Sequence, residues 1–148
     1  DLYHWDATAY PQWRWDVDSC WSDDGSGDIV NKLVTHIRDI PSPKSSILLL
    51  LKPHTKNLPD AAFSMIGPVY LACYAIWGRP EEDDINRKWV IKTMELLRPH
   101  MKGHYINESN YVDIHARRMN SFSTTAWEKL KRLSSKYDPD NLFHSYLE

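Results

Sequence analysis

Ile47-Leu48-Leu49-Leu50-Leu51 is a continuous apolar run bounded by polar residues. Its short length and its lack of alternation predict a central strand that is buried on both faces of a sheet. A second apolar stretch, Val69–Trp77, alternates loosely and predicts another strand, which Gly78-Arg79-Pro80 closes. These two predicted strands form the expected centre of the fold, and the other elements are assigned around them.

Three amphipathic helices are expected around these strands. Ser26 or Asp28 caps the first helix. The acidic run Glu81–Asp84 suits the positive end of the second helix dipole, and Thr125 with Glu128 forms a capping box for the third. The expected apolar faces are, in chain order, Ile29, Leu33, Ile37 and Ile40; Ile85, Trp89, Val90, Thr93, Leu96 and Leu97; and Trp127, Leu130, Leu133 and Tyr137.

Weaker patterns predict three further strand segments. Alternation of Trp13, Trp15 and Val17 indicates one strand, Ala61–Phe63 begins a short one, and Tyr105–Asn110 is expected to be a strand that enters a loop. Helices that alternate with short strands are typical of α+β or α/β proteins. A domain boundary is expected near residues 100–112.

Composition excludes several classes of function. The chain has 148 residues, which suits one domain, and a net charge of −2, which gives no broad attraction to nucleic acid or anionic lipid. Neither apolar run approaches the roughly 20 residues of a membrane-spanning helix. The one G-x-G, at Gly25 and Gly27, has Val30 where a third glycine would stand, so the sequence holds no dinucleotide fingerprint. The N-terminus lacks both an initiator Met and a signal-peptide pattern, so we expect a processed or truncated chain.

Metal and thiol chemistry find little support in the sequence. His100 and His104 have the i, i+4 spacing of zinc ligands, but Pro99 and Gly103 disfavour a helix there, so exposed loop histidines and no metal site are expected. The acidic run at 81–84 is likewise taken as a helix start rather than a metal site. Cys20 and Cys73 could form one disulfide or remain two buried free thiols, and the second state is favoured. These patterns alone indicate an α+β domain without a readable function.

The C-terminal third adds a resemblance to a known family. Tyr105-Ile106-Asn107-Glu108, a loop and then the segment Trp127–Phe143 resemble the C-terminal signature of berberine-bridge-enzyme-like FAD-linked oxidases. That signature is Y-x-N, an aromatic residue, R-L, a Lys-rich helix and K-Y-D-P-x-N-x-F. Pro41-Ser42-Pro43 and Pro59–Phe63 resemble the family more loosely. Phe122–Trp127 departs from it, since Thr124 and Ala126 stand where the family has Gly and Asn.

The resemblance implies a fold and a domain organisation. The fold class is α+β, an antiparallel sheet flanked by helices as in the substrate domain of an FAD-linked oxidase, with a C-terminal helical tail. Residues 1–103 would be part of the substrate-binding domain and residues 104–148 the berberine-like C-terminal segment. The family's FAD-binding domain, with its phosphate loop and its covalent His or Cys, has no counterpart in these 148 residues.

The resemblance also implies a function for the complete protein. This chain would be the C-terminal part of an FAD-dependent oxidoreductase and would form the substrate-side wall of the flavin site. Hydride would pass from a small-molecule substrate to FAD, with O2 as the expected acceptor. Tyr105 would be the catalytic acid/base or substrate-orienting group, Asn107 would contact the cofactor and Phe63 would line the substrate pocket. The FAD-binding domain would come from the same parent chain or from a separate chain, and no nucleic acid, membrane or metal is expected.

Two other functions remain open from the sequence. The chain could be a non-enzymatic α+β binding or interaction module with aromatic side chains in a groove, or an inactive fragment. Part of a larger protein should expose an apolar face at Tyr105, Tyr111, Trp127 and Phe143. The compartment is left open, although Asn107-Glu108-Ser109 is a glycosylation sequon that would suit a secreted protein.

Overall fold

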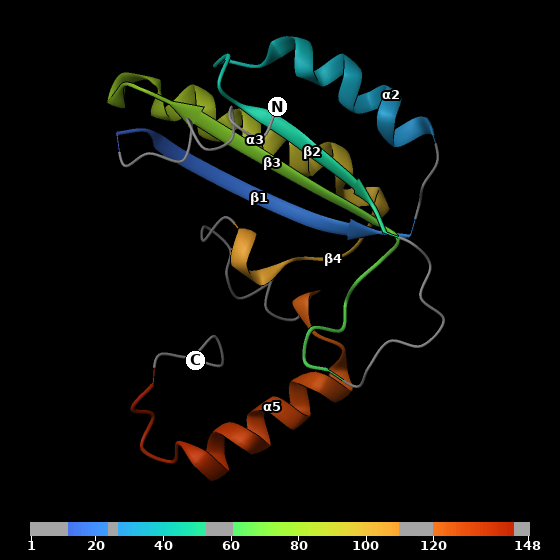
Figure 1. Cartoon of the computed structure of the whole chain (residues 1–148), viewed down its shortest axis with the longest axis vertical. Helices are drawn as coiled ribbons and strands as arrows, with labels where there is room; N and C mark the ends of the chain where they lie inside the picture. Colours follow the sequence, from blue (N-terminus) through green and yellow to red (C-terminus); the bar gives the residue numbers. More distant parts are fainter. Residues whose placement is uncertain (1–11, 24–26, 53–60, 110–119, 144–148) are drawn as a thin grey trace.

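A single antiparallel sheet organises the chain in the computed structural model (Figure 1). Its strand order is β2-β3-β1-β4, and every neighbouring pair runs antiparallel. The described residues are 12–23, 27–52, 61–109 and 120–143. The strands are β1 (Arg14–Ser22), β2 (Ser46–Leu51), β3 (Val69–Trp77) and β4 (Met101–Gly103), and the helices are α2 (Gly27–His36), α3 (Asp83–Leu97) and α5 (Thr124–Tyr137). Short 3-10 turns cover Ile37–Asp39, Pro80–Glu82, Arg98–His100 and Ile106–Glu108.

Strand β3, and not β2, is the buried strand of the sheet. All nine residues of β3 are buried, because β1 and β2 pair with its two edges and clusters of apolar side chains cover both of its faces. The prediction of a central strand at Ile47–Leu51 was therefore wrong in position: β2 is an edge strand, and Leu51 is 73% exposed. A run of leucines without alternation indicates a strand but does not show how many neighbours it pairs with.

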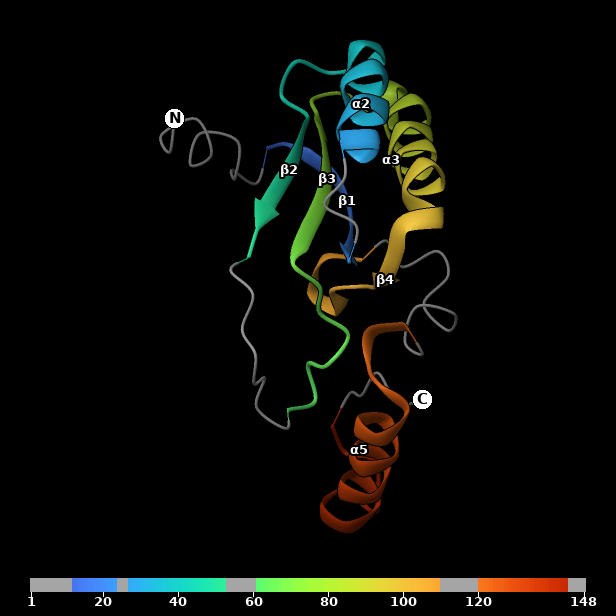
Figure 2. The ribbon, with the colours of Figure 1, turned by 90° about the vertical axis from the view of Figure 1, so that its right-hand side faces the viewer.

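Helices α2 and α3 cover one face of the sheet (Figure 2). Two clusters of buried side chains form this core: Cys20, Ile29, Leu33, Val69, Leu71, Met94 and Leu97 in the first, and Cys73, Ala75, Trp77, Trp89 and Val90 in the second. Each large apolar side chain buried there contributes about 1.5–3 kcal/mol of hydrophobic stabilisation. The prediction of a strand at Trp13–Val17 and of the helices α2 and α3 is confirmed.

The buried face of α3 is rotated from the predicted one. Asn86 and Met94 are buried in it, whereas Ile85 and Leu96 are exposed. At the start of the helix, Asp83 accepts a hydrogen bond from Trp77 Nε1 in β3 at 2.8 Å. This bond attaches the helix to the sheet on the side of Asp83. The face of α2 is also shorter than predicted, since Ile37 belongs to the following 3-10 turn and is exposed.

Other local predictions are corrected by the structure. Ala61–Phe63 forms no strand and is irregular backbone. The segment Tyr105–Asn110 is no strand where it is described: pairing with β1 ends at Gly103, and a 3-10 turn follows Tyr105. Helix α5 begins one residue before Thr125, and its cap is Ser123, whose hydroxyl accepts from the Ala126 amide at 3.2 Å.

Helix α5 lies apart from the sheet and its helices (Figure 1). The second half of its predicted apolar face is in solvent, since Leu133 and Tyr137 are exposed, whereas Trp127 and Leu130 are half-buried. Phe143 is 72% exposed, as expected for part of a larger protein. Of the other residues predicted on that face, Tyr105 and Trp127 are half-buried and Tyr111 lies outside the described residues.

Both cysteines are free and buried, as favoured from the sequence. In the described part of the chain, the longest helices are too short and too polar to cross a membrane. The division at residues 103 and 104 stays a prediction. Contacts do cross that point, because His104 Nδ1 lies 2.9 Å from the carbonyl oxygen of Ser19 in β1.

Candidate functional site

The face of the sheet opposite α2 and α3 is rich in aromatic side chains. The register pairs Val17 with Tyr74 and Trp21 with Tyr70, and residues that face each other across antiparallel strands lie on the same side of the sheet. Tyr70, Ala72, Tyr74 and Ile76 are packed there with Trp13, Val17, Trp21, Leu48 and Tyr105. Helices α2 and α3 lie on the other side (Figure 2), and we call this side the aromatic face.

The three predicted site residues meet at one end of the aromatic face. The Tyr105 ring lies 5.3 Å from the Phe63 ring and 6.1 Å from the Tyr70 ring, measured between centroids. Nδ2 of Asn107 donates to the Tyr105 hydroxyl oxygen at 3.2 Å. Phe63 is 40% exposed and Asn107 is exposed. The structure therefore brings Tyr105, Asn107 and Phe63 together from two distant segments and leaves part of them accessible.

Three residues of this site were missed from the sequence. The hydroxyls of Tyr70 and Tyr74 both donate to Oε2 of Glu108, and the Tyr74 bond is 2.8 Å long. Burial, and then the hydrogen bond to Glu108, raise the pKa of both phenols above its ordinary value. The available signal was the spacing of the two tyrosines, which lie four apart on a strand and hence on one face.

The two candidate zinc ligands, His100 and His104, contact different parts of the structure. His104 is buried rather than exposed, and its ring faces the Ser19 carbonyl. Nε2 of His100, which is partly buried, lies 3.2 Å from Lys32 Nζ. Neither histidine belongs to a group of three metal-binding side chains anywhere in the described ranges. The expectation of exposed loop histidines was thus wrong for both: the pairing of β4 with β1 draws His104 against the sheet, and the His100 side chain is only 15% exposed beside α2.

The acidic run starts α3 as predicted. Asp83 accepts from Nη2 of Arg14 at 2.7 Å as well as from Trp77, and the Arg14 hydrogen bond holds the pKa of this carboxyl below its usual value. Glu82 pairs with Arg79 and Asp84 with Lys88. These carboxylates serve ion pairs and helix initiation.

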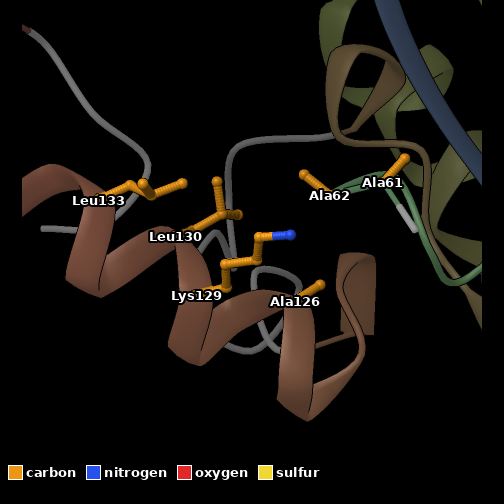
Figure 3. Close-up of a pocket in the computed structure, with 6 residues that line it drawn as sticks. All are labelled: Ala61, Ala62, Ala126, Lys129, Leu130 and Leu133. Carbon is orange, nitrogen blue, oxygen red and sulfur yellow. The ribbon is translucent and has the colours of Figure 1, made fainter.

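A small pocket separates α5 from the segment that carries Phe63 (Figure 3). Its volume is about 100 Å³, and it is lined by Ala61, Ala62, Ala126, Lys129, Leu130 and Leu133. The Lys129 ammonium is the one ionisable group in this lining, so the pocket offers no acid–base pair. The segment has a structural role, since Ser64 Oγ accepts from the backbone nitrogen of Ser123 at 2.7 Å and so connects α5 to the aromatic face.

Comparison with known proteins gives two sequence relatives, and no family model matches the chain. The chain is 32% identical over 84 residues to the FAD-linked oxidoreductase nodO of Hypoxylon pulicicidum, a match that covers 57% of this chain and 18% of the relative. It is 27% identical over 128 residues to the FAD-linked oxidoreductase ptmO of Penicillium ochrochloron, covering 85% of this chain and 28% of the relative.

Solved structures of flavoenzymes share the fold. CrmK, a flavoenzyme involved in shunt product recycling in caerulomycin biosynthesis, superposes with a TM-score of 0.72 at 16% identity over 90% of this chain and 32% of its own. Physcomitrella patens BBE-like 1 gives a TM-score of 0.70 at 16% identity, over 90% of this chain and 30% of its own. The chain thus spans a third or less of the length of these relatives. Its sequence is similar to one part of two FAD-linked oxidoreductases, and it has the α+β fold of one part of the flavoenzyme structures.

Proposed function

We propose that this chain forms the substrate-side wall of the flavin site in an FAD-dependent oxidoreductase. The main support is that Tyr105 contacts both Phe63 and Asn107 at the accessible end of the aromatic face. A relationship to FAD-linked oxidoreductases supports the proposal. When bound, FAD would accept a hydride from the substrate, and O2 is the acceptor that we propose for its reoxidation.

The residues present fit one part of FAD and not the other. A planar isoalloxazine suits a surface of aromatic rings with a hydroxyl and an amide at its edge, which Phe63, Tyr105 and Asn107 supply. The phosphates need a glycine-rich cradle, and the G-x-G at Gly25 has Val30 in its third position. We propose that an FAD-binding domain, in the same parent chain or in a separate one, holds the phosphates.

The hydrogen bond between Asn107 and Tyr105 assigns roles to both side chains. Because the amide donates to the phenol oxygen, the phenol's own proton stays free to be given to a substrate atom. The same bond would stabilise the phenolate after that transfer, so Tyr105 can also accept a proton. Phe63 would limit how the substrate lies against Tyr105, because the two ring centroids are 5.3 Å apart.

Localisation can be proposed from the same geometry. Asn107 is exposed, so the sequon could be used in a secreted protein. A glycan would be attached to Nδ2, the same nitrogen that donates to Tyr105. The proposed role of Asn107 therefore requires an unmodified side chain, which peptide mass spectrometry of the native protein can establish.

The test is the visible absorption spectrum of the protein purified from its native source under mild conditions. Bound flavin, followed by substrate-dependent bleaching without oxygen and by peroxide release with oxygen, would support the proposal. Alcohols, sugars and amines are the substrates to survey. A flavin-free protein whose intact mass equals these 148 residues would contradict it and would favour the binding module or the inactive fragment.

A further inference from the structure

Two tyrosines and one glutamate converge beneath the turn that carries Asn107. Tyr70 and Tyr74 are four residues apart on β3, so their Cα atoms are separated by about 13 Å. Their hydroxyls nevertheless reach the same carboxylate oxygen, Oε2 of Glu108. Both tyrosines are buried, and Glu108 supplies a carboxylate acceptor to each hydroxyl inside the protein.

The backbone around Glu108 is also tied to the sheet. Ser19 Oγ in β1 donates to the Glu108 carbonyl oxygen at 2.7 Å. The amide nitrogen of Glu108 donates to the Tyr105 carbonyl at 3.0 Å, which closes the 3-10 turn, and Ser109 Oγ donates to that carbonyl at 3.0 Å. One turn is therefore anchored to β1 through its main chain and to β3 through its glutamate side chain.

We infer that Glu108 is a positioning residue, which holds the Ile106–Glu108 turn on β3 through Tyr70 and Tyr74 and so places the Tyr105 hydroxyl and the Asn107 amide at the aromatic face. The inference rests on the proposed function of Tyr105 and Asn107. Glu108 acts through the turn, because its carboxylate is bonded to the two phenols rather than to either of those side chains.

Because both phenols donate to Oε2 of Glu108, substitutions of Glu108 that keep or remove this acceptor should differ in their effect. A glutamine carbonyl oxygen has two lone pairs and can accept both phenols. Glu108→Gln should therefore retain the anchoring, although its charge is lost. Glu108→Ala removes the carboxylate to which both phenols donate and should release the turn. The double variant Tyr70→Phe/Tyr74→Phe removes the same two bonds, keeps both rings in the core and serves if Glu108→Ala fails to fold.

The first measurement is amide hydrogen exchange of the peptide that spans residues 104–109 in the full-length protein. Exchange should become about tenfold faster or more in Glu108→Ala and in the double phenylalanine variant, and should stay near wild type in Glu108→Gln. Glu95→Ala, which alters an exposed glutamate on α3, is the matched control and should change nothing. Unchanged exchange in both Glu108→Ala and the double variant Tyr70→Phe/Tyr74→Phe would overturn the inference.

The second measurement uses the flavin-containing protein. The turnover number kcat should fall between about tenfold and a hundredfold in Glu108→Ala, with KM nearly unchanged and with recovery in Glu108→Gln. Faster exchange with unchanged kcat would overturn the positioning role. A protein without flavin would instead contradict the proposed function, and the exchange result alone would then decide whether Glu108 anchors the turn.

Discussion

Asn107 Nδ2 donates a hydrogen bond to the Tyr105 hydroxyl oxygen at 3.2 Å. The two residues were predicted to share one face of a strand, where alternate Cα atoms lie about 6.6–6.8 Å apart. They instead stand at the start of a 3-10 turn, in which the rise is only about 2.0 Å per residue. The shorter rise brings the amide within reach of the phenol, so the pair forms one hydrogen-bonded unit.

The first prediction concerns the Tyr105 hydroxyl. In the flavin-containing protein, Tyr105→Phe should lower kcat by about 10²–10⁴-fold if the phenol transfers a proton. The fold should persist, because the ring contacts with Phe63 and Tyr70 are retained. Steady-state kinetics measure the effect, with the exposed Tyr137→Phe as the control. A Tyr105→Phe enzyme of wild-type kcat would remove Tyr105 from the acid–base role.

The second prediction separates two candidate caps of α5. Ser123→Ala should destabilise the helix by about 0.5–2 kcal/mol, because its hydroxyl accepts from the Ala126 amide. The bond from the Ser123 nitrogen to Ser64 Oγ survives that change. Thr125→Ala should be nearly neutral, since Thr125 lies within the helix and is exposed. Hydrogen exchange of the first turn of α5 measures the loss of helix stability in both variants. A larger loss in Thr125→Ala than in Ser123→Ala would support the capping box predicted from the sequence.

The third prediction compares two glycines. A Cβ at Gly103 would lie 2.5 Å from Met65 Cβ and 2.7 Å from the Asn120 carbonyl oxygen, so the backbone of β4 would have to move. Gly103→Ala should therefore destabilise the protein by about 1–3 kcal/mol. A Cβ at Gly27 meets nothing within 4 Å, so Gly27→Ala should be neutral or slightly stabilising. Urea unfolding of the full-length variants gives both values, and equal effects would argue against the close approach at Gly103.

The fourth prediction is a loss of stability in alkali caused by the buried thiols. Burial raises the pKa of Cys20 and of Cys73 from the ordinary 9.0 to about 12. The folded protein therefore keeps these protons above pH 9.0, where the unfolded chain releases them. The free energy of unfolding contributed by the thiols is present below pH 9.0 and is lost as the pH rises toward 12.

Two measurements check the thiols. In the folded protein neither cysteine should react with a thiolate-directed reagent near neutral pH, whereas both should react after unfolding. The double variant Cys20→Ala/Cys73→Ala should lose stability less steeply between pH 9 and 12 than the wild type, and the phenols of Tyr70 and Tyr74 account for part of the slope that remains. Parallel slopes would show that the thiols do not titrate with unfolding.

Much of the secondary structure could be predicted because it depends on local patterns. Alternation indicated β1, and the 3.6-residue periodicity indicated α2 and α3. The wrong predictions concern features that depend on contacts with residues distant in the sequence. Asp83 bonds Trp77 of β3 at the start of α3, and the pairing of β4 with β1 ends at Gly103, before Tyr105. The candidate site was found through the motif at 105–107, but its glutamate and tyrosines were not.

Local sequence patterns predicted the strands β1, β2 and β3 and the helices α2, α3 and α5, and the Y-x-N and K-Y-D-P segments supplied the resemblance to FAD-linked oxidases. Only the tertiary structure decided that β3 is the buried strand and that Glu108 meets Tyr70 and Tyr74. Those residues are separated by 38 and 34 positions in the chain. Periodicity describes the face of one element, whereas the register between β1, β3 and the turn after β4 decides which faces meet. That register depends on the burial and hydrogen bonding of the whole sheet at once.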